Sequence, residues 1–401
     1  MSAYLIPIET ALLTFPILAA IITIPYIIHQ FRTYGSILPM RVLIIYSFIF
    51  YLLCAYFLVI LPLPPIEEVA QYTKPYVQLI PFESLKEFSM YSSFIWNDPS
   101  TYWTALNEPS LFLIVFNILL SVPFGIYLRY YFHCSFKKTL LASFLLSLSF
   151  ECIQLSALFG IYPRPYRVFD VDDLLTNTLG GVLGYGIAPI FSHFLPTRDA
   201  LDEQSYQKGK DVSTLRQSVA FLLDFVLIVL ITAILFMLFA LSTISYNFEN
   251  YYRDIFIIYI LVVSLTCLVL PIITKGKTIG KAIVNIRLAT PNESNPAWYE
   301  TLLHFFMLYI IIIPMPYYIC LLIFNFFKDT TTLRYLYLLI AIIFIIGYSI
   351  TLVQYISSLF HRDNTTWYEH KTRLKNISTI LPEDEENDLL EEENNQEEIN
   401  A

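Results

Sequence analysis

Long apolar segments alternate with shorter polar ones along most of the chain, and this pattern predicts membrane-spanning helices. A helix needs about 20 mostly apolar residues to cross the hydrocarbon core of a bilayer. Nine segments meet this requirement, and they cover about 5–28, 42–62, 110–128, 139–160, 173–194, 217–241, 254–273, 301–325 and 335–359. We therefore expect an all-α fold, a polytopic transmembrane helical bundle with about nine spans.

A polar linker at 196–215 separates five of these spans from the other four. So sharp a change of composition indicates a domain boundary, which we place near residue 205. We expect a five-span membrane domain over 1–205 and a four-span membrane domain over 206–376. The segment 377–401 is expected to be an acidic, disordered cytoplasmic tail.

The distribution of Lys and Arg predicts the orientation in the membrane. If the N-terminus lies outside, the inner segments hold 17 of the 24 basic residues and the outer segments hold 7. Basic residues are enriched on the cytoplasmic side of membrane proteins. We therefore expect the N-terminus outside and the C-terminus inside.

Composition agrees with a multi-pass protein of the cell membrane, since 56% of the residues are hydrophobic and 14% are charged. Ten of the 33 acidic residues lie between Glu383 and Glu398, so the net charge of -9 belongs to the tail. The five cysteines form no CxxC pair, which argues against a disulfide framework or a zinc site. We expect a lipid bilayer as the surroundings, no nucleic-acid partner, no cofactor and no metal.

Polar residues are concentrated where the fourth and fifth spans face the outside. Glu151 and Gln154 share one face of the fourth span, and counting from Gly160 places them ~14 Å and ~9 Å deep. A second face follows from spacings of 3, 4, 3 and 4 residues in the fifth span, and it holds Asp170, Asp173, Asn177, Gly180 and Gly184.

A short loop joins these two helices, so we expect them to be antiparallel neighbours whose polar residues meet in one outward-facing pocket. Arg164 and Arg167 would stand at its mouth. A purely structural interpretation stays open. In it, Asp170 or Asp172 caps the helix, the glycines allow close packing, and the arginines lie among lipid headgroups. An acid inside a span, as at Glu151, is costly and is usually functional or paired.

The motif Glu151-x-x-Gln154, followed by Arg167-x-x-Asp170-x-x-Asp173-x-x-x-Asn177-x-x-Gly180, resembles the core signature of the VanZ-like family. "QLIPFESL" at 78–85 resembles that family's outer-loop element, with Gln78 where Asn is usual. The resemblance covers roughly 1–195. It implies a cell-envelope role in a Gram-positive bacterium, since the family is named for a protein associated with teicoplanin resistance.

The outer segment of about 63–108 is long and rich in aromatic residues, which include Trp96 and Trp103. Tyr and Trp anchor at membrane interfaces, so the segment is expected either to lie on the bilayer or to cover a substrate as a lid.

The second half places Arg216 and Asp224 eight residues apart, ahead of "KGKTIGKAIVNIRL" at 275–288. This combination resembles the RDD family of membrane proteins, with Thr278 and Lys281 in the family's T-x-G-K element. It covers about 212–376, although the family's usual further Asp is replaced by "ATPNE". Arg216 is either a positive-inside anchor or a site residue, and Asp224 is either a packing partner or an ion or proton site.

Three functions remain open from the sequence. The first is a non-enzymatic envelope protein that alters access of glycopeptides to their target or binds an envelope lipid intermediate. The second is a transporter or cation/proton antiporter that uses Glu151 and Asp224. The third is a membrane-embedded hydrolase, which no Ser/His pair or HExxH motif supports. We expect the first, with no catalytic residues.

Overall fold

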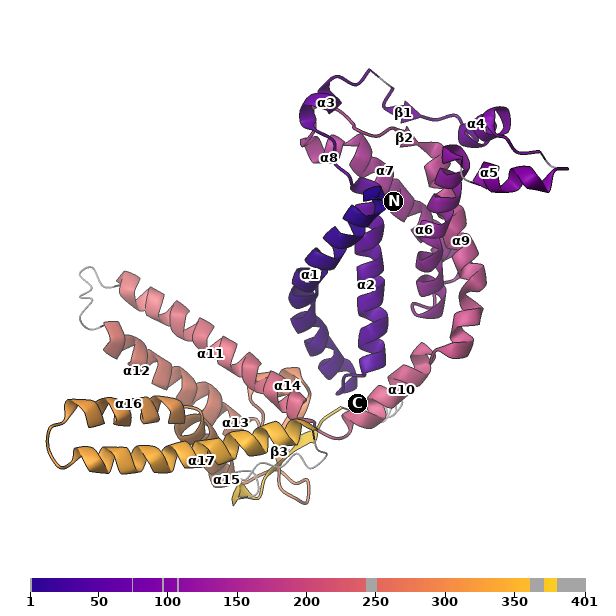
Figure 1. Ribbon diagram of the computed structural model, residues 1–401. Coiled ribbons are helices and arrows are strands. Elements are labelled where there is room, and N and C mark those ends of the chain that lie inside the picture. Colours follow the sequence, from indigo (N-terminus) through magenta and orange to yellow (C-terminus); the bar gives the residue numbers. More distant parts are fainter. Residues whose placement is uncertain are drawn as a thin grey trace, which may run out of the picture. The chain divides into compact units, whose positions relative to one another are not determined.

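The computed structural model describes residues 2–73, 75–95, 97–106, 108–242, 251–360 and 371–380, and it is almost entirely helical (Figure 1). The predicted helical fold is confirmed. The chain divides into two compact units, one of Met1–Thr23 and Leu38–Asp202, the other of Ile24–Ile37 and Glu203–Ala401. The boundary therefore runs through two helices, which are α1 (Ser2–Tyr34) and α10 (Arg198–Gly209).

Long apolar helices make up the first unit together with the start of α1, and they are α2 (Pro39–Ile60), α6 (Pro109–Tyr130), α7 (Phe136–Leu155) and α9 (Val171–Phe194). Glycine brings α6 and α9 into backbone contact. A Cβ atom at Gly184 would lie 2.0 Å from the carbonyl oxygen of Val122, and one at Gly180 would lie 2.2 Å from that of Ile118. The predicted packing role of these two glycines is confirmed.

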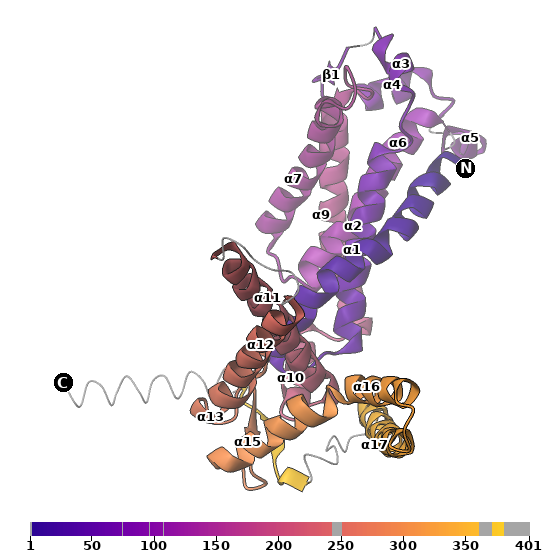
Figure 2. The same ribbon diagram turned by 90° about the vertical axis from the view of Figure 1, so that its left-hand side faces the viewer.

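The outer segment has secondary structure of its own, which comprises α3 (Ile66–Ala70), β1 (Val77–Gln78), α4 (Glu83–Tyr91), η1 (Pro99–Thr101) and α5 (Tyr102–Leu106). Both ribbon views show α3, β1 and α4 at one end of the helices of this unit (Figures 1 and 2). Strand β1 pairs in parallel with β2 (Phe169–Asp170), immediately before α9.

The fourth span ends earlier than the sequence suggested. Helix α7 stops at Leu155, and α8 (Ala157–Gly160) is a turn in which Leu158 and Phe159 have φ values of 52° and 59°. These left-handed conformations cannot continue an α-helix. The expected depths were therefore too large, because Glu151 lies only four residues, or ~6 Å, from the end of α7.

The second unit contains the remaining helices, which are α11 (Thr214–Ser242), α12 (Tyr251–Val263), α13 (Leu270–Ile273), α14 (Ile279–Ile283), α15 (Trp298–Phe306), α16 (Met315–Lys328) and α17 (Arg334–Phe360). Two segments of this unit are π-helical: η3 (Ser264–Val269) lies between α12 and α13, and η4 (Met307–Ile312) lies between α15 and α16. Strands β3 (Ile286–Ala289) and β4 (Lys375–Ser378) pair antiparallel. Strand β4 thus includes Ile377 and Ser378, which we assigned to the tail. The acidic segment 383–398 lies outside the described residues.

Within the described part of the chain, eight helices are long and apolar enough to cross a membrane. The bent pair of 298–312 and Met315–Lys328, with an angle of 42° at its break, would raise the number to nine if it forms one span. Length and composition therefore agree with eight or nine spans, and the orientation of the termini stays a prediction.

Candidate functional site

A cavity of about 410 Å³ lies in the first unit, between α2, α6, α7 and α9, and residues of α4 contribute to its wall. Six of the seven residues predicted for this site line it, and they are Glu151, Gln154, Arg167, Asp170, Asp173 and Asn177. We call this cavity the acidic cavity, for the charge described below. The spacing of these residues in the sequence therefore predicted correctly that they share one cavity.

Arg164 is the exception among the seven. Its guanidinium lies over the ring of Tyr76, 4.6 Å from the ring centroid, and it is not among the cavity-lining residues. A cation over an aromatic face is a favourable contact, so this arginine holds the loop before β2 against the outer segment. We had placed Arg164 at the mouth together with Arg167.

The two polar residues of α7 are buried and bonded to neighbouring elements. Glu151 is 2% exposed, and its carboxylate accepts a hydrogen bond from the backbone N–H of Asp170 at 3.0 Å. The side-chain amide of Gln154 donates to the carbonyl oxygen of Val59 in α2 at 3.1 Å. Both side chains thus tie α7 to the walls of the cavity.

Helix α9 contacts a pair of polar residues on α6 that we did not anticipate. The amide of Asn117 donates to the carboxylate of Asp173 at 2.6 Å. One helical turn further along α6, the hydroxyl of Ser121 donates to the side-chain oxygen of Asn177 at 3.0 Å. The available signal was the i, i+4 spacing of Asn117 and Ser121 within an otherwise apolar span.

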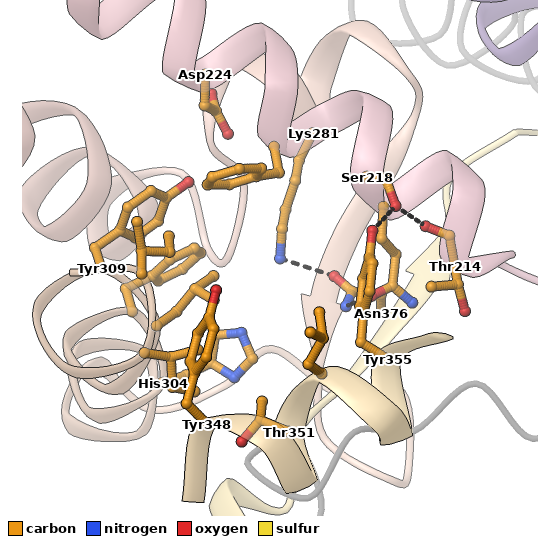
Figure 3. A pocket seen from close by; sticks show the side chains of 17 residues that line it. Thr214, Ser218, Asp224, Lys281, His304, Tyr309, Tyr348, Thr351, Tyr355 and Asn376 are labelled. Atoms are coloured by element: carbon orange, nitrogen blue, oxygen red, sulfur yellow. Dashed lines mark hydrogen bonds between the residues drawn. The ribbon is translucent and has the colours of Figure 1, made fainter. Parts of the chain in front are cut away.

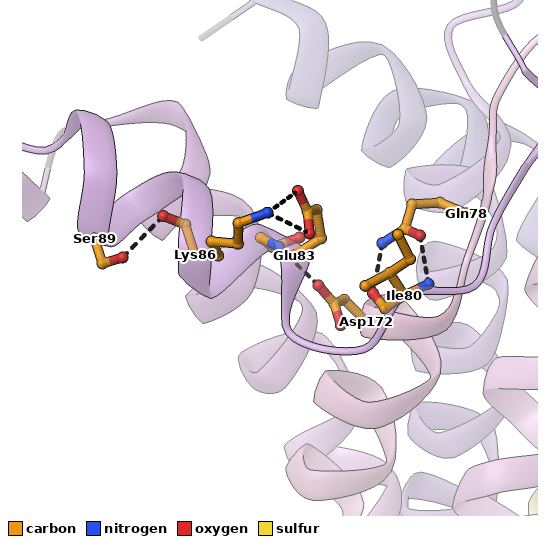
Figure 4. A network of polar contacts seen from close by, with 7 residues as sticks. Gln78, Ile80, Glu83, Lys86, Ser89 and Asp172 are labelled. Atoms are coloured by element: carbon orange, nitrogen blue, oxygen red, sulfur yellow. Dashed lines mark hydrogen bonds and ion pairs between the residues drawn. The ribbon is translucent and has the colours of Figure 1, made fainter.

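Asp170 and Asp172 have separate roles at the start of α9. Asp170 is the N-cap, and its carboxylate accepts the backbone N–H of Asp172 at 2.8 Å. The Asp172 carboxylate accepts the backbone N–H groups of Phe82 at 2.5 Å and of Ser84 at 2.8 Å. Figure 4 shows the Asp172 side chain next to Glu83, the first residue of α4. We had expected Asp172 at most to cap its own helix. Instead, the Asp172 side chain links the outer segment to α9 through these two hydrogen bonds.

Acidic side chains outnumber basic ones among the described residues that line the acidic cavity. Among its described lining residues, Arg167 is the cation, whereas the carboxylates come from Glu87, Glu151, Asp170, Asp172 and Asp173. Burial raises the pKa of Asp170, and the nearby charges of Asp172 and Glu87 raise it further, against a hydrogen bond from the Asp172 backbone that lowers it. Such a field attracts a cationic group.

No cluster of three or more His, Cys, Asp or Glu side chains that could hold a metal ion occurs within the described residues. The carboxylates instead accept hydrogen bonds from backbone and amide N–H groups at several points of the wall. Because their oxygens are held in place, they can meet a cationic ligand with little reorganisation.

In the second unit, Asp224 connects α11 to α14. Its two carboxylate oxygens accept hydrogen bonds from the hydroxyl of Thr278 and from the backbone N–H of Gly280, both at 2.6 Å. Thr278 is also the N-cap of α14 and accepts the backbone N–H of Lys281 at 3.2 Å. The sequence allowed a partner on a neighbouring helix, and this is the arrangement observed.

Arg216 lies completely buried at the start of α11, with 0% exposure. Its guanidinium donates to the carbonyl oxygens of Asn285, Val284 and Gly209 at 2.7, 2.8 and 2.9 Å. This pattern joins α11 to the chain before β3 and to the end of α10. Arg216 therefore serves packing and does not line the acidic cavity.

The VanZ/LLP1 family model matches residues 48–192, and the RDD family model matches residues 213–368. The chain joins a VanZ-like domain to an RDD family domain. All residues that line the acidic cavity, from Leu58 to Asn177, lie within the VanZ-like match. Both families are membrane domains, so the chain is a multi-pass membrane protein of the cell envelope.

Comparison with curated proteins and with solved structures gave no match.

Proposed function

We propose that the VanZ-like domain binds a cationic, amine-bearing group of a cell-envelope component in the acidic cavity, and thereby lowers susceptibility to teicoplanin-type glycopeptides. The observation that supports this proposal is the charge of the wall, with five carboxylates around a single described arginine. A carboxylate that accepts a hydrogen bond from an ammonium forms a strong, charge-assisted contact.

The size of the acidic cavity limits which ligands can bind in it. Sites for small molecules range from about 300 to 1,000 Å³. At about 410 Å³, this cavity suits a single head group better than a whole lipoglycopeptide. The ligand we propose is therefore an envelope lipid intermediate with an amine, and the antibiotic would be affected indirectly, through altered access to its surface target.

We propose binding without catalysis. Glu151 and Asp173 already accept hydrogen bonds from Asp170 and Asn117, which supports a role as fixed acceptors for a ligand. Incubating the purified protein with a lipid-linked intermediate tests this point, and consumption of the lipid would instead favour the hydrolase.

Susceptibility to teicoplanin in a sensitive bacterial host tests the proposed function. We expect expression of the wild-type protein to raise the inhibitory concentration, and Glu151→Gln or Asp173→Asn to abolish the effect at equal membrane abundance. Glu67→Gln is the matched control, because Glu67 is exposed on α3 and does not line the cavity. The proposal fails if all three variants protect equally, or if the wild-type protein gives no protection.

A transporter remains the second candidate because Asp224 is an acid within an apolar helix beside a cavity. Against it, both Asp224 oxygens accept hydrogen bonds from α14 and its cap, which supports a packing role. Cation-dependent proton flux in vesicles that is abolished by Asp224→Asn would favour the transporter.

A further inference from the structure

A second cavity of about 390 Å³ lies inside the RDD domain, between α11, α14, α15, η4, α17 and β4 (Figure 3). In contrast to the acidic cavity, its wall is mainly aromatic and aliphatic, with contributions from Phe221, Phe305, Tyr309, Ile312, Tyr348 and Leu352. We call it the aromatic cavity. Mostly apolar walls with a few polar groups are typical of small-molecule sites.

The ammonium of Lys281 points toward the middle of the aromatic cavity (Figure 3). It lies 2.7 Å from the side-chain oxygen of Asn376 and 5.0 Å from the ring centroid of Phe305, and Lys281 is 8% exposed. An ammonium has three N–H donors, so an anionic oxygen can join or replace the Asn376 oxygen. Shielding from water strengthens such a charge-assisted contact.

The other charged group on the wall, Asp224, is engaged inside the domain. Both of its oxygens accept hydrogen bonds, from Thr278 and from the backbone of Gly280. These donors stabilise the carboxylate without a ligand. Lys281 is therefore the positive group that an anionic guest would meet in the aromatic cavity.

The wall formed by α15 and η4 has an unusual backbone. Leu308, Tyr309 and Ile312 line the aromatic cavity from η4, which is π-helical, and the helix breaks directly after it with a bend of 42°. π-helical turns are rare and occur frequently at functional sites. This π-helix supplies three residues of the cavity wall.

We propose that the aromatic cavity of the RDD domain binds a single-chain amphipathic anion, with a carboxylate or phosphate at Lys281 and an apolar part against the aromatic wall. The volume is near the lower end of the range for small-molecule sites, which favours one chain over a two-chain phospholipid. The anion can be a free amphiphile or a membrane lipid that places one acyl chain in the cavity.

Photolabelling of the full-length protein in phosphatidylcholine nanodiscs tests this inference. Three diazirine probes are compared, which are dodecanoate, a dodecyl chain with a trimethylammonium end, and phosphatidylglycerol with a photoreactive acyl chain. We expect dodecanoate to label 298–312 and 348–355 at least about tenfold more than the cationic probe. Labelling by phosphatidylglycerol as well would identify a membrane lipid as the source, and labelling by dodecanoate alone a free amphiphile.

Variants of the lysine separate charge recognition from nonspecific partitioning. Lys281→Met should reduce dodecanoate labelling about tenfold or more, and Lys281→Arg should retain most of it. Lys277→Met removes a nearby lysine that does not line the aromatic cavity and should leave labelling unchanged. Ile312→Trp keeps Lys281 but fills the cavity, so it should also abolish labelling.

Equal labelling by the cationic probe would overturn the inference. So would labelling that survives both Lys281→Met and Ile312→Trp, or an absence of labelling by both anionic probes.

Discussion

Substitution of Asp172 tests how the outer segment is attached to α9, because this side chain bonds to Phe82 and Ser84, about ninety positions earlier in the sequence. Asp172 is 5% exposed, and its carboxylate accepts two backbone N–H groups at the start of α4. Asp172→Asn preserves the shape of the side chain but leaves one acceptor oxygen for the two backbone N–H groups. Its NH₂ group then faces the second N–H, which has lost its acceptor. We therefore expect α4 to lose its attachment to α9 while the membrane helices stay folded.

The magnitude follows from the two contacts. A hydrogen bond to a charged group contributes about 1.5–3 kcal/mol, and the two bonds share one carboxylate, so they do not add fully. We expect Asp172→Asn to lower the free energy of local opening by about 2–3 kcal/mol. At 1.4 kcal/mol for each factor of ten, amide exchange in this segment should become about 30- to 150-fold faster.

Hydrogen–deuterium exchange of peptides that cover 79–91 measures this change directly. The matched control is Asp98→Asn, because the half-buried Asp98 also accepts a backbone N–H, from Ser100 at 3.0 Å, but at the start of η1. The control should accelerate exchange only near 98–101. Unchanged exchange over 79–91 in Asp172→Asn, or an equal change there in the control, would refute the anchoring role.

Three further predictions concern packing and charge. Gly184→Ala should destabilise the protein by about 1–3 kcal/mol and lower its Tm in detergent, because the new Cβ would meet the carbonyl oxygen of Val122. Gly186→Ala is the control and should leave the Tm unchanged, since a Cβ there would have no atom within 4 Å beyond its chain neighbours and the adjacent backbone of its own helix. Arg216→Lys should lower the free energy of unfolding by about 1–3 kcal/mol, and with it the Tm, because an ammonium cannot reach all three buried carbonyl oxygens. The control is Arg253→Lys, since Arg253 is exposed. Binding of a cationic probe to the acidic cavity should weaken as the pH falls, because protonation removes the negative charge of the carboxylates. Since the pKa of Asp170 is raised, this loss of affinity should begin above the ordinary pH range for Asp. A titration of probe affinity should show a smaller pH dependence in Asp170→Asn.

Helical periodicity accounts for the part of the site that could be predicted. Asp170, Asp173 and Asn177 follow one another at helical spacing, and the connection from α7 through α8 and β2 to α9 brings them near Glu151 and Gln154. Local rules of this kind fix which residues share a face, and the fold then places those faces against one cavity.

Long-range contacts account for what could not be predicted. Asn117 belongs to a separate helix, and its i, i+4 spacing with Ser121 indicates a polar face but not the contact with Asp173. The contact of Asp172 with Phe82 and Ser84 depends on how the outer segment returns to the start of α9. The early end of α7 arises from left-handed residues that are neither Gly nor Asn, so no turn signal marked it.

Arginines were the least predictable residues. A basic residue near a span end suggests a headgroup contact or a ligand, since both are common. Arg216 instead bonds three backbone carbonyls, and Arg164 lies over Tyr76. Both outcomes depend on which carbonyl or ring the fold brings near the guanidinium.

Direct binding of a small amine tests the central claim, that the acidic cavity of the VanZ-like domain recognises a cationic group. Saturation-transfer NMR with the full-length protein in nanodiscs can compare hexylamine with hexanoate, which differ mainly in the sign of their charge. The protein carries Lys281→Met in this experiment, so that the anion site proposed in the RDD domain does not contribute. We predict that hexylamine binds, that hexanoate does not, and that Glu151→Gln with Asp173→Asn weakens hexylamine binding at least about tenfold. Equal binding of the two probes, or hexylamine binding that the double variant leaves unchanged, would contradict the account.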